Sequence, residues 1–576
     1  MSMSFRSLPV FEKRRFVPEG AVLTKKDEVA ALLKILLDRE MGSLGDLERL
    51  ILDRSEFDAA LGQAGSILYI EMTCDTADSA KAKAYQDFVE NVEPVVKSLE
   101  HALNEKILKA QEVFSLPAGR YEIYLRSARA EVELFVDKNI PLQTEVALLS
   151  QEYQTVCGAM MVDFEGQERT LPEMSKFLLE SDRDLRERAW RATSERRMKD
   201  KDRVEEIFDK MRNLRHQIAC NAGHENFRDY QFKAYLRYDY TPSDCKAYHK
   251  SIREVVVPLR REIDDHRRRM MKVSSLRPWD VAVDVLNRAV LKPFDDVAQL
   301  KAGVKNIFHR LDRDLGNLYQ DMDSLGLLDL ASRKGKAPGG YQNTLAEARK
   351  PFIFMNAVGV DDDIRTLLHE SGHAFHSYLS AHDPIVDYRH APMEFCEVAS
   401  MSMELMANDL ITEFYSPQDA RRSAVEHLEG MISVLAWVAT VDAFQHWMYE
   451  HPAHSSGERQ MAWVGFHQEF GGGVIDWSGL EEARAYLWHR QLHIFEVPFY
   501  YIEYGIAQLG ALQLWQQSKK DPCAAIQNYK RGLSLGGSRP LPELFSESGI
   551  RFDFSKNMIA PLMDEVYKEW KKLSGL

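Results

Sequence analysis

Residues 369–373 read His369-Glu370-Ser371-Gly372-His373, and this stretch decides how the chain of 576 residues is interpreted. On a helix, side chains four residues apart lie one above the other, so both imidazoles can reach one metal ion. Glu370 directly follows the first histidine, where a carboxylate can take a proton from a water molecule on that metal. The motif predicts a zinc site with His369 and His373 as ligands and Glu370 as the base.

The flanking residues extend this motif into a predicted helix over residues 361–379. The helix opens with three aspartates, which suit the positive end of a helix dipole. Its apolar residues recur at helical spacing and form a face that packs inward, namely Ile364, Leu367, Leu368, Phe375 and Leu379. His369, His373 and His376 lie on a different face of the helix from these apolar residues. We therefore expect one buried side and one metal-binding side.

A third ligand has to come from elsewhere, because catalytic zinc takes three protein ligands and leaves one position open. Pro392 is suited to the start of a second helix, and residues 393–410 contain no interior helix breaker. Glu394, Glu397 and Glu404 share one side of that helix. Glu397 is central to the row, but spacing alone leaves Glu394 nearly as good a candidate.

Three blocks of sequence together resemble the oligoendopeptidase F branch of the M3 zinc peptidases, to which thimet oligopeptidase and neurolysin are more distantly related. The blocks are PFIFMN at 351–356, HESGHAFHSYL at 369–379 and FCEVAS at 395–400. The resemblance implies that Glu397 is the third ligand of a single Zn²⁺ ion. It also implies that Ser400 and Glu404 orient the ligands.

A fourth block, residues 493–505, resembles the His-and-Tyr segment near the C-terminus of the same family. There a histidine and tyrosines hydrogen-bond the substrate carbonyl and the oxyanion, the role expected of donors aimed at developing charge. The resemblance implies this role for His493, Tyr501 and Tyr504. Tyr500 stays open as an alternative to Tyr501, since either can share a helical face with Tyr504.

The resemblance implies a mainly α-helical, two-lobed metallopeptidase with a deep substrate channel and a small β-sheet near the zinc helix. The implied activity is hydrolysis of internal peptide bonds in short unfolded oligopeptides by a zinc-bound water that Glu370 activates. One alternative is a zinc carboxypeptidase with a related fold. Another is a non-enzymatic helical protein with a structural metal, although such a site has no use for a base at Glu370.

The remaining chain reads mostly as helix, with a predicted division into an N-terminal helical region (1–165) and a catalytic region (166–576). Helical spacing of apolar residues marks 25–37, 77–103, 145–157, 204–219 and 243–271. Ser181 and Asp184 form a weak capping box for a helix reaching about Met198.

Two glycine-rich interruptions stand out within the predicted catalytic region. The first, residues 333–350, precedes a predicted strand over 351–358, which we expect to present an edge to an extended peptide. The second, Gly471-Gly472-Gly473, is either a flexible substrate loop or a plain turn.

Composition limits the remaining function classes. The net charge of −14 argues against a nucleic-acid partner. The six cysteines are scattered without a C-x-x-C pair, which argues against disulfides or a Cys-rich zinc site. Residues 1–16 have no apolar core of signal-peptide length, and no stretch approaches the apolar length of a membrane span, so we expect a cytoplasmic protein without a membrane partner.

Three polar residues near these motifs have simpler interpretations. His376 follows the ligand stripe, but a fourth protein ligand would close the site to water, so we expect it to pack or to support a ligand. Cys396 points about 100° away from its neighbour Glu397 on a helix and is expected to be packed. His489 is expected to be structural or at the surface.

Overall fold

The computed structural model describes residue 5 and residues 8–576, and these form two compact units assembled from separate segments. Unit 1 comprises 1–133, 291–424 and 507–552, and unit 2 comprises 134–290, 425–506 and 553–576. The helices α5, α16 and α20 have residues in both units. The expectation about the first 16 residues falls partly on 1–4 and 6–7, outside the described residues. The division at residue 165 stays a prediction.

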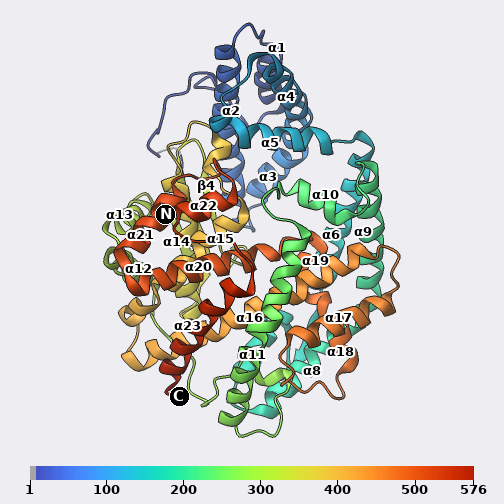
Figure 1. Ribbon diagram of the computed structural model, residues 1–576, viewed down its shortest axis with the longest axis vertical. Helices are drawn as coiled ribbons and strands as arrows, with labels where there is room; N and C mark the ends of the chain where they lie inside the picture. Colours follow the sequence, from blue (N-terminus) through green and yellow to red (C-terminus); the bar gives the residue numbers. More distant parts are fainter. Residues whose placement is uncertain (1–4, 6–7) are drawn as a thin grey trace. The chain divides into compact units, whose positions relative to one another are not determined.

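Unit 1 contains the predicted metal motif, one three-stranded sheet and the helices around it (Figure 1). Its elements are α1 (Lys26–Asp38), α2 (Leu44–Cys74), α3 (Ser79–Asn91), α4 (Glu93–Phe114), α5 (Ala118–Leu134), α12 (Val297–Leu311), α13 (Arg313–Ser324), β3 (Leu328–Ala331), β4 (Tyr341–Leu345), β5 (Lys350–Ala357), α14 (Asp361–Leu379), α15 (Met393–Met406), α20 (Ile502–Lys520), α21 (Pro522–Leu533) and α22 (Leu541–Glu547).

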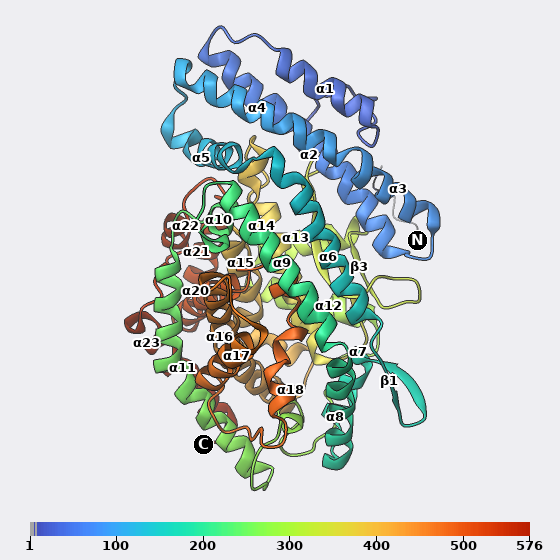
Figure 2. The same ribbon diagram turned by 90° about the vertical axis from the view of Figure 1, so that its right-hand side faces the viewer.

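The N-terminal helices of unit 1 share a core with the chain that follows the metal helix. Figure 2 shows α1, α2 and α4 packed side by side, and their buried apolar residues form one cluster with Ile385 and Tyr388. The Tyr388 hydroxyl donates to the Arg120 carbonyl at 2.8 Å and accepts from the Tyr124 amide at 3.1 Å. This buried tyrosine fastens the N-terminal helices to the segment after α14.

The sheet of unit 1 has the order β3-β5-β4, which corrects one prediction. β5, the predicted strand at 351–358, is the central strand, parallel to β3 and antiparallel to β4. Its residues are buried almost without alternation, as expected for a strand covered on both faces. β4, which lies inside the segment expected to be an interruption, is the edge strand beside α14.

The helices α14 and α15 approach each other closely in unit 1. Asp363 closes the start of α14 by accepting from the backbone amides of 358–360 at 2.7–2.9 Å. Gly372 faces α15, where an added Cβ would lie 2.5 Å from the Ala399 carbonyl oxygen and 2.5 Å from the Ser400 Cα. The missing side chain is therefore what lets the two helices that carry the predicted ligands touch.

Unit 2 is built from helices and one β-hairpin. Its elements are α6 (Ile140–Gly158), β1 (Met161–Phe164), β2 (Gln167–Thr170), α7 (Leu171–Met174), α8 (Arg183–Lys199), α9 (Lys201–Asn221), α10 (Phe227–Ala234), α11 (Pro242–Met270), α16 (Pro417–Glu450), α17 (Ser456–Phe470), α18 (Glu481–Ala485), α19 (Leu492–Glu496) and α23 (Lys556–Ser574).

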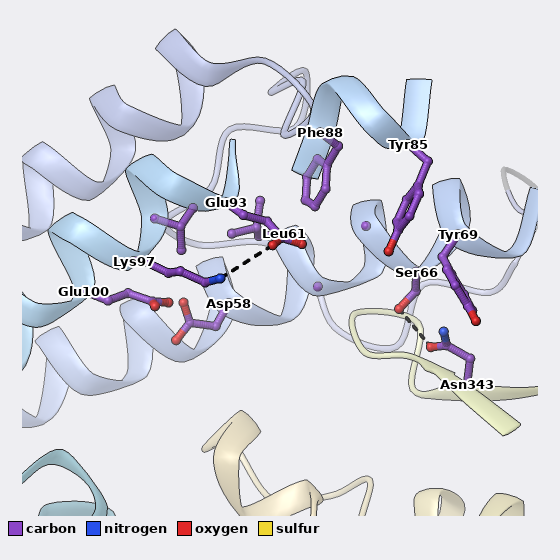
Figure 3. A pocket seen from close by; sticks show the side chains of 13 residues that line it. Asp58, Leu61, Ser66, Tyr69, Tyr85, Phe88, Glu93, Lys97, Glu100 and Asn343 are labelled. Atoms are coloured by element: carbon purple, nitrogen blue, oxygen red, sulfur yellow. Dashed lines mark hydrogen bonds and ion pairs between the residues drawn. The ribbon is translucent and has the colours of Figure 1, made fainter. Parts of the chain in front are cut away.

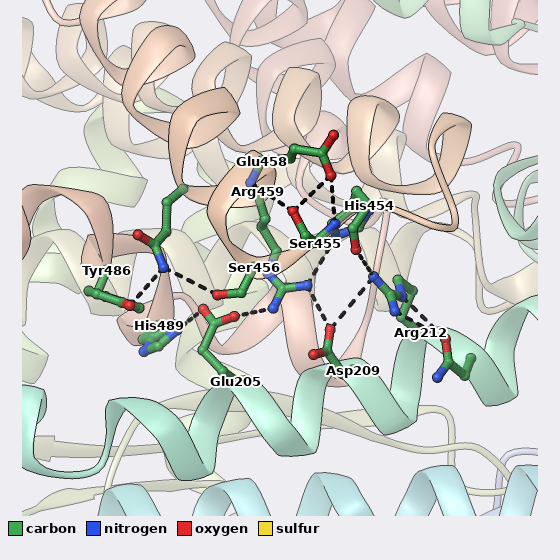
Figure 4. A network of polar contacts seen from close by, with 12 residues as sticks. Glu205, Asp209, Arg212, His454, Ser455, Ser456, Glu458, Arg459, Tyr486 and His489 are labelled. Carbon is green, nitrogen blue, oxygen red and sulfur yellow. Dashed lines mark hydrogen bonds and ion pairs between the residues drawn. The ribbon is translucent and has the colours of Figure 1, made fainter.

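A buried polar network joins three parts of unit 2 (Figure 4). Arg459 is fully buried and donates to Glu205, to Asp209 at 2.8 Å and to the Nε2 of His454 at 3.0 Å. Glu205 also contacts the Nε2 of His489 at 2.8 Å. His489 is therefore a buried structural histidine, which agrees with one of its two expected roles.

The structure confirms a mainly α-helical fold with a small sheet next to the motif helix, and it corrects several boundaries. The helix expected over 77–103 is broken at Val92 into α3 and α4. The helix α15 ends at Met406 rather than at residue 410. Asp182, rather than Ser181, caps α8, and Pro392 precedes α15 as its N-cap. The two-lobed arrangement around a channel stays a prediction.

One helix departs from the expectation that no segment has membrane-spanning composition. The helix α16 contains an 18-residue window with a mean hydropathy of 1.3, and 56% of that window is buried. A core helix passes the same test, so this is weak evidence for a membrane span. Asp442, Gln445 and His446 are buried on the same helix. Asp442 pairs with His249 of α11, and Gln445 accepts a hydrogen bond from the Phe499 amide.

Candidate metal centre and active site

The structure brings His369, His373 and Glu397 together in unit 1. The Nε2 of His369 lies 3.3 Å from the Oε2 of Glu397, and the Nε2 of His373 lies 3.7 Å from the same oxygen. One donor atom from each residue falls within 4.8 Å of the others. The two histidines of α14 and Glu397 of α15 therefore lie close together, as the sequence predicted.

Two further side chains contact these donors, and they are the two for which the family resemblance implies an orienting role. The Oε1 of Glu404 lies 2.7 Å from the Nδ1 of His369, which turns the Nε2 of that ring toward Glu397. The Ser400 hydroxyl donates to the Oε2 of Glu397 at 2.9 Å and to the Glu397 carbonyl at 3.0 Å. The α15 helix thus supplies a ligand candidate and both groups that orient the set.

The donor set fits a catalytic zinc ion. Two imidazole nitrogens and one carboxylate oxygen are a known three-residue set for catalytic zinc, with a position left for water or substrate. The histidine side chains keep 24% and 18% of their surface exposed, so the donors are open on one side. A closed structural site would have no such opening.

Glu370 lies on the same turn of α14 as the two histidines and contacts the edge of the sheet. Its carboxylate accepts a hydrogen bond from the Gln342 backbone amide of β4. Burial is the largest effect on this carboxyl and raises its pKa to about 7. A carboxyl with this pKa can accept and return a proton near neutral pH.

The groups around Glu397 keep its carboxylate ionised, and burial keeps the imidazole of His373 neutral. Burial alone would raise the pKa of Glu397, but the adjacent histidines and the Ser400 hydroxyl lower it to about 2. Burial lowers the pKa of His373 to about 4, which leaves that ring neutral and able to bind a metal.

Three other polar residues near the proposed metal ligands are not part of the ligand set. His376 is buried with its Nε2 lacking a hydrogen-bond partner among the described residues, and its ring packs edge-on against Phe395. Cys396 is buried and donates to the Ala391 carbonyl at 3.4 Å, as expected for a packed thiol. Glu394 is buried on α15 but has no place in the metal-binding group.

His493, Tyr501 and Tyr504 form a cluster in unit 2. The Tyr504 hydroxyl lies 3.5 Å from the Nε2 of His493, and the ring of Tyr501 packs edge-on against the imidazole at 4.9 Å between centroids. Tyr500 belongs to the same cluster, with its ring 5.4 Å from that of Tyr504. The predicted residues thus meet one another, and their role toward the metal ligands of unit 1 belongs to the proposal below.

Comparison with known proteins now assigns the family. The sequence model of peptidase family M3 matches residues 177–563, and that of the peptidase M3 N-terminal domain matches residues 24–135. The chain belongs to peptidase family M3. This confirms the family that the sequence motifs predicted.

Individual relatives of this M3 chain are distant in sequence and close in fold. A structure of Pz peptidase A with an inhibitor superimposes with a TM-score of 0.87 at 27% identity, covering 98% of this chain and 99% of that one. An oligoendopeptidase F homologue from Borreliella burgdorferi is 24% identical over 52% of each chain. Oligopeptidase PepF from Bacillus subtilis is 23% identical over 41% of this chain and 36% of its own length. The chain thus spans about half or less of these curated relatives.

Two residues of the M3 chain that the sequence motifs did not reveal fix the orientation of His493. The Trp437 indole N–H, which can only donate, lies 3.0 Å from the Oε1 of Gln491. The amide nitrogen of Gln491 is therefore the group that donates to the Nδ1 of His493 at 2.8 Å. Burial lowers the pKa of His493, so the neutral ring carries its proton on Nε2. The ring presents an N–H donor on the side of Tyr504.

The same contacts distinguish Tyr501 from Tyr504. The Tyr501 hydroxyl is hydrogen-bonded by Trp437 and Gln491, while burial raises its pKa. The Tyr504 hydroxyl instead lies beside the Nε2 of His493. Tyr501 is thus tied to the residues that orient the histidine, and Tyr504 to its donor side.

A pocket of about 440 Å³ lies in unit 1 beside β4 (Figure 3). One end holds Asp58, Glu93 and Glu100 together with Lys97, which pairs with Glu93 at 3.8 Å. Tyr69, Tyr85 and Phe88 line the other end. Burial raises the pKa of Asp58 to about 7, with a smaller contribution from the charge of Glu100, and burial also raises the pKa of Glu100. Asn343 lines the pocket next to Gln342, so the pocket opens beside the strand that contacts Glu370.

Proposed function

We propose that the chain is a zinc-dependent oligoendopeptidase that hydrolyses internal peptide bonds of short unfolded oligopeptides. The observation that carries this proposal is the convergence of His369, His373 and Glu397 in contact distance of one another, with Glu370 on the same helical turn. The names of the M3 relatives support the class of activity. The cytoplasmic location and the absence of nucleic-acid or membrane partners stay predictions.

His369, His373 and Glu397 would hold the zinc ion. When bound, the ion supplies Lewis-acid chemistry: it polarises a carbonyl and makes a water molecule more acidic. Glu404 and Ser400 keep the His369 ring and the Glu397 carboxylate in orientation. These contacts leave Glu370 outside the ligand set, so its carboxylate remains available as a base.

Glu370 accepts the proton of the attacking water and returns it to the leaving amine. Its contact with the Gln342 amide places the base against the edge strand β4. An extended peptide that adds to this edge would pass the base, since strand addition aligns the backbone of the guest with the sheet. In our proposal His493 and Tyr504 donate hydrogen bonds to the oxyanion, while Tyr501 supports them.

The test uses a short peptide with both ends blocked and an internal quenched fluorophore. We expect cleavage at an internal bond, its loss on chelation and its return with zinc. Glu370→Gln is expected to abolish turnover while the protein still binds zinc, because only the base is removed. Full turnover by a zinc-loaded Glu370→Gln protein would overturn the mechanism, and cleavage confined to peptides with a free C-terminus would favour the carboxypeptidase alternative.

A matched pair of variants tests the third ligand. Glu397→Gln is expected to bind one equivalent of zinc fewer than the natural sequence, whereas Glu394→Gln, one turn earlier on α15, is expected to bind as much as the natural sequence. The reverse result would assign the ligand to Glu394. An unchanged zinc content in both variants would show that neither glutamate is the third ligand.

A further inference from the structure

A second group of metal-ligand side chains is buried in unit 2. Cys245 and His249 lie four residues apart near the start of α11, and Asp442 and His446 lie four residues apart on α16. Each pair shares one helical face, so two helices present two donors each to one another. Cys245 and Asp442 are fully buried, and His446 and His249 are 2% and 9% exposed.

The donor atoms are close enough to share one ion. Donor atoms of Cys245, Asp442 and His446 all lie within 4.8 Å of one another. The Oδ2 of Asp442 lies 3.4 Å from the Nε2 of His446 and 2.8 Å from the Nε2 of His249. The carboxylate is thus the centre on which both histidines converge, with the thiol beside it.

The polar atoms of this cluster are incompletely satisfied. The Nδ1 of His446 and the Oδ1 of Asp442 have no hydrogen-bond partner among the residues that the structure describes. Aromatic rings of Phe232 and Phe499 pack edge-on against His446, so water is displaced from that side. Leaving a buried polar atom unpaired is unfavourable, which makes such a group a sign of a missing ligand.

Charge balance points the same way. The ion pairs of Asp442 within the described residues run to His249 and His446 alone. A divalent cation with one thiolate and one carboxylate makes a neutral cluster, which removes the cost of a buried net charge. The thiol of Cys245 releases its proton to solvent on binding, as metal-ligating thiols do.

We propose that Cys245, Asp442 and His446 bind a second metal ion between α11 and α16, with His249 orienting the Asp442 carboxylate through its contact at 2.8 Å. Thiolate, imidazole and carboxylate donors together favour zinc over magnesium or calcium. All three donors are buried, and a closed setting is typical of a structural ion rather than a catalytic one. This ion would fasten α11 to α16 and is independent of the hydrolytic site in unit 1.

The first experiment counts metal in the purified full-length protein. We expect two equivalents of zinc in the natural sequence and one in His373→Ala, which removes a ligand in unit 1. Adding Cys245→Ser to His373→Ala is expected to remove the remaining equivalent. A folded His373→Ala protein that binds no metal would overturn the proposal.

Cobalt(II) as the only added metal provides a second measurement that leaves the proposed ligands intact. In His373→Ala, cobalt is expected to produce a thiolate-to-metal charge-transfer band in the near ultraviolet. Cys220→Ser is the matched control, because Cys220 is exposed and its Sγ lies 3.7 Å from the Nε2 of His216, another pair four residues apart. The band should survive in Cys220→Ser; its absence in His373→Ala, or its loss in Cys220→Ser, would contradict the assignment.

Discussion

The Nδ1 of His369 contacts Glu404 at 2.7 Å while the Nε2 of the same ring faces Glu397 at 3.3 Å. One imidazole is thus held from behind by a carboxylate of α15 and directed in front toward another carboxylate of the same helix. Because Glu404 fixes the ring without reaching the proposed zinc position, its contribution can be separated from that of the ligands.

Glu404→Ala is expected to weaken zinc binding by about 10–100-fold, the usual effect of removing a residue that orients a ligand. Glu404→Gln keeps an oxygen that can accept from the Nδ1 of His369 and should lose less. Competition with a chelator of known affinity measures both variants. Unchanged zinc affinity in Glu404→Ala would show that His369 is oriented by other contacts.

Gly372→Ala is expected to destabilise the protein by about 2 kcal/mol, because the new methyl group overlaps backbone atoms of α15 that have little freedom to move. It should also weaken zinc binding, since α14 and α15 carry the proposed ligands. Gly465→Ala on α17 is the control: its Cβ meets nothing within 4 Å, and alanine suits a helix interior. Urea unfolding compares the two, and equal stability would contradict the close-contact explanation.

Tyr504→Phe is expected to lower kcat by about 100-fold with little change in KM, as for removal of one oxyanion donor. Tyr501→Phe should have the smaller effect, because that hydroxyl is engaged by Trp437 and Gln491. Steady-state kinetics on the blocked peptide decides between them. A larger loss in Tyr501→Phe would reverse the assignment.

The buried His454 makes stability sensitive to acid. Its Nδ1 contacts the His451 carbonyl and its Nε2 accepts from Arg459, which requires a neutral ring (Figure 4). Burial is the main reason that its pKa falls from 6.5 to about 4. The unfolded chain therefore binds a proton between these pH values that the folded chain does not, and stability is lost as pH falls through this window.

The shift corresponds to at most about 3 kcal/mol at pH 4. His454→Gln retains an oxygen that can accept from Arg459 and has no charge to gain, so its urea midpoint should depend less on pH between 7 and 4.5. Parallel pH dependence in the two proteins would assign the acid sensitivity to other groups.

The pocket beside β4 has three carboxyls and one lysine at one end, and we expect it to favour a positively charged substrate side chain there. Glu100→Gln should raise the KM several-fold for a peptide whose lysine side chain enters this pocket. The KM for the same peptide with methionine in place of that lysine should stay unchanged. Glu90→Gln provides the control, since Glu90 is exposed and does not line the pocket. An equal change for both peptides would show that charge is not recognised there.

Local spacing was enough to predict the ligand pair on α14, because two residues four apart on a helix meet the same point. The choice between Glu394 and Glu397 was not local: it depends on where α15 contacts Gly372, and only the family resemblance chose Glu397. The Trp437 and Gln491 contacts are likewise absent from any pattern, since the two residues are separated by 54 positions and meet through tertiary packing.

The errors in the fold have two physical sources. The helix break at Val92 had a visible signal in Pro94, which lies in the first turn of α4, where proline is tolerated. The central position of β5 in the sheet had no signal in the sequence, because strand order follows from long-range pairing with β3 and β4 rather than from the strand's own residues. Boundaries could thus have been improved from sequence, whereas the identity of the edge strand required the fold.

The one-way chain of donors from Trp437 through Gln491 to His493 bears on the design of inhibitors. Since the indole cannot accept, the amide cannot reverse without losing a contact, and the imidazole is kept as a donor at its Nε2. A compound that addresses this ring should therefore offer an oxygen or another acceptor, and an amine at the same position would meet a like group. Selectivity against peptidases with an unconstrained histidine can be sought at this single atom.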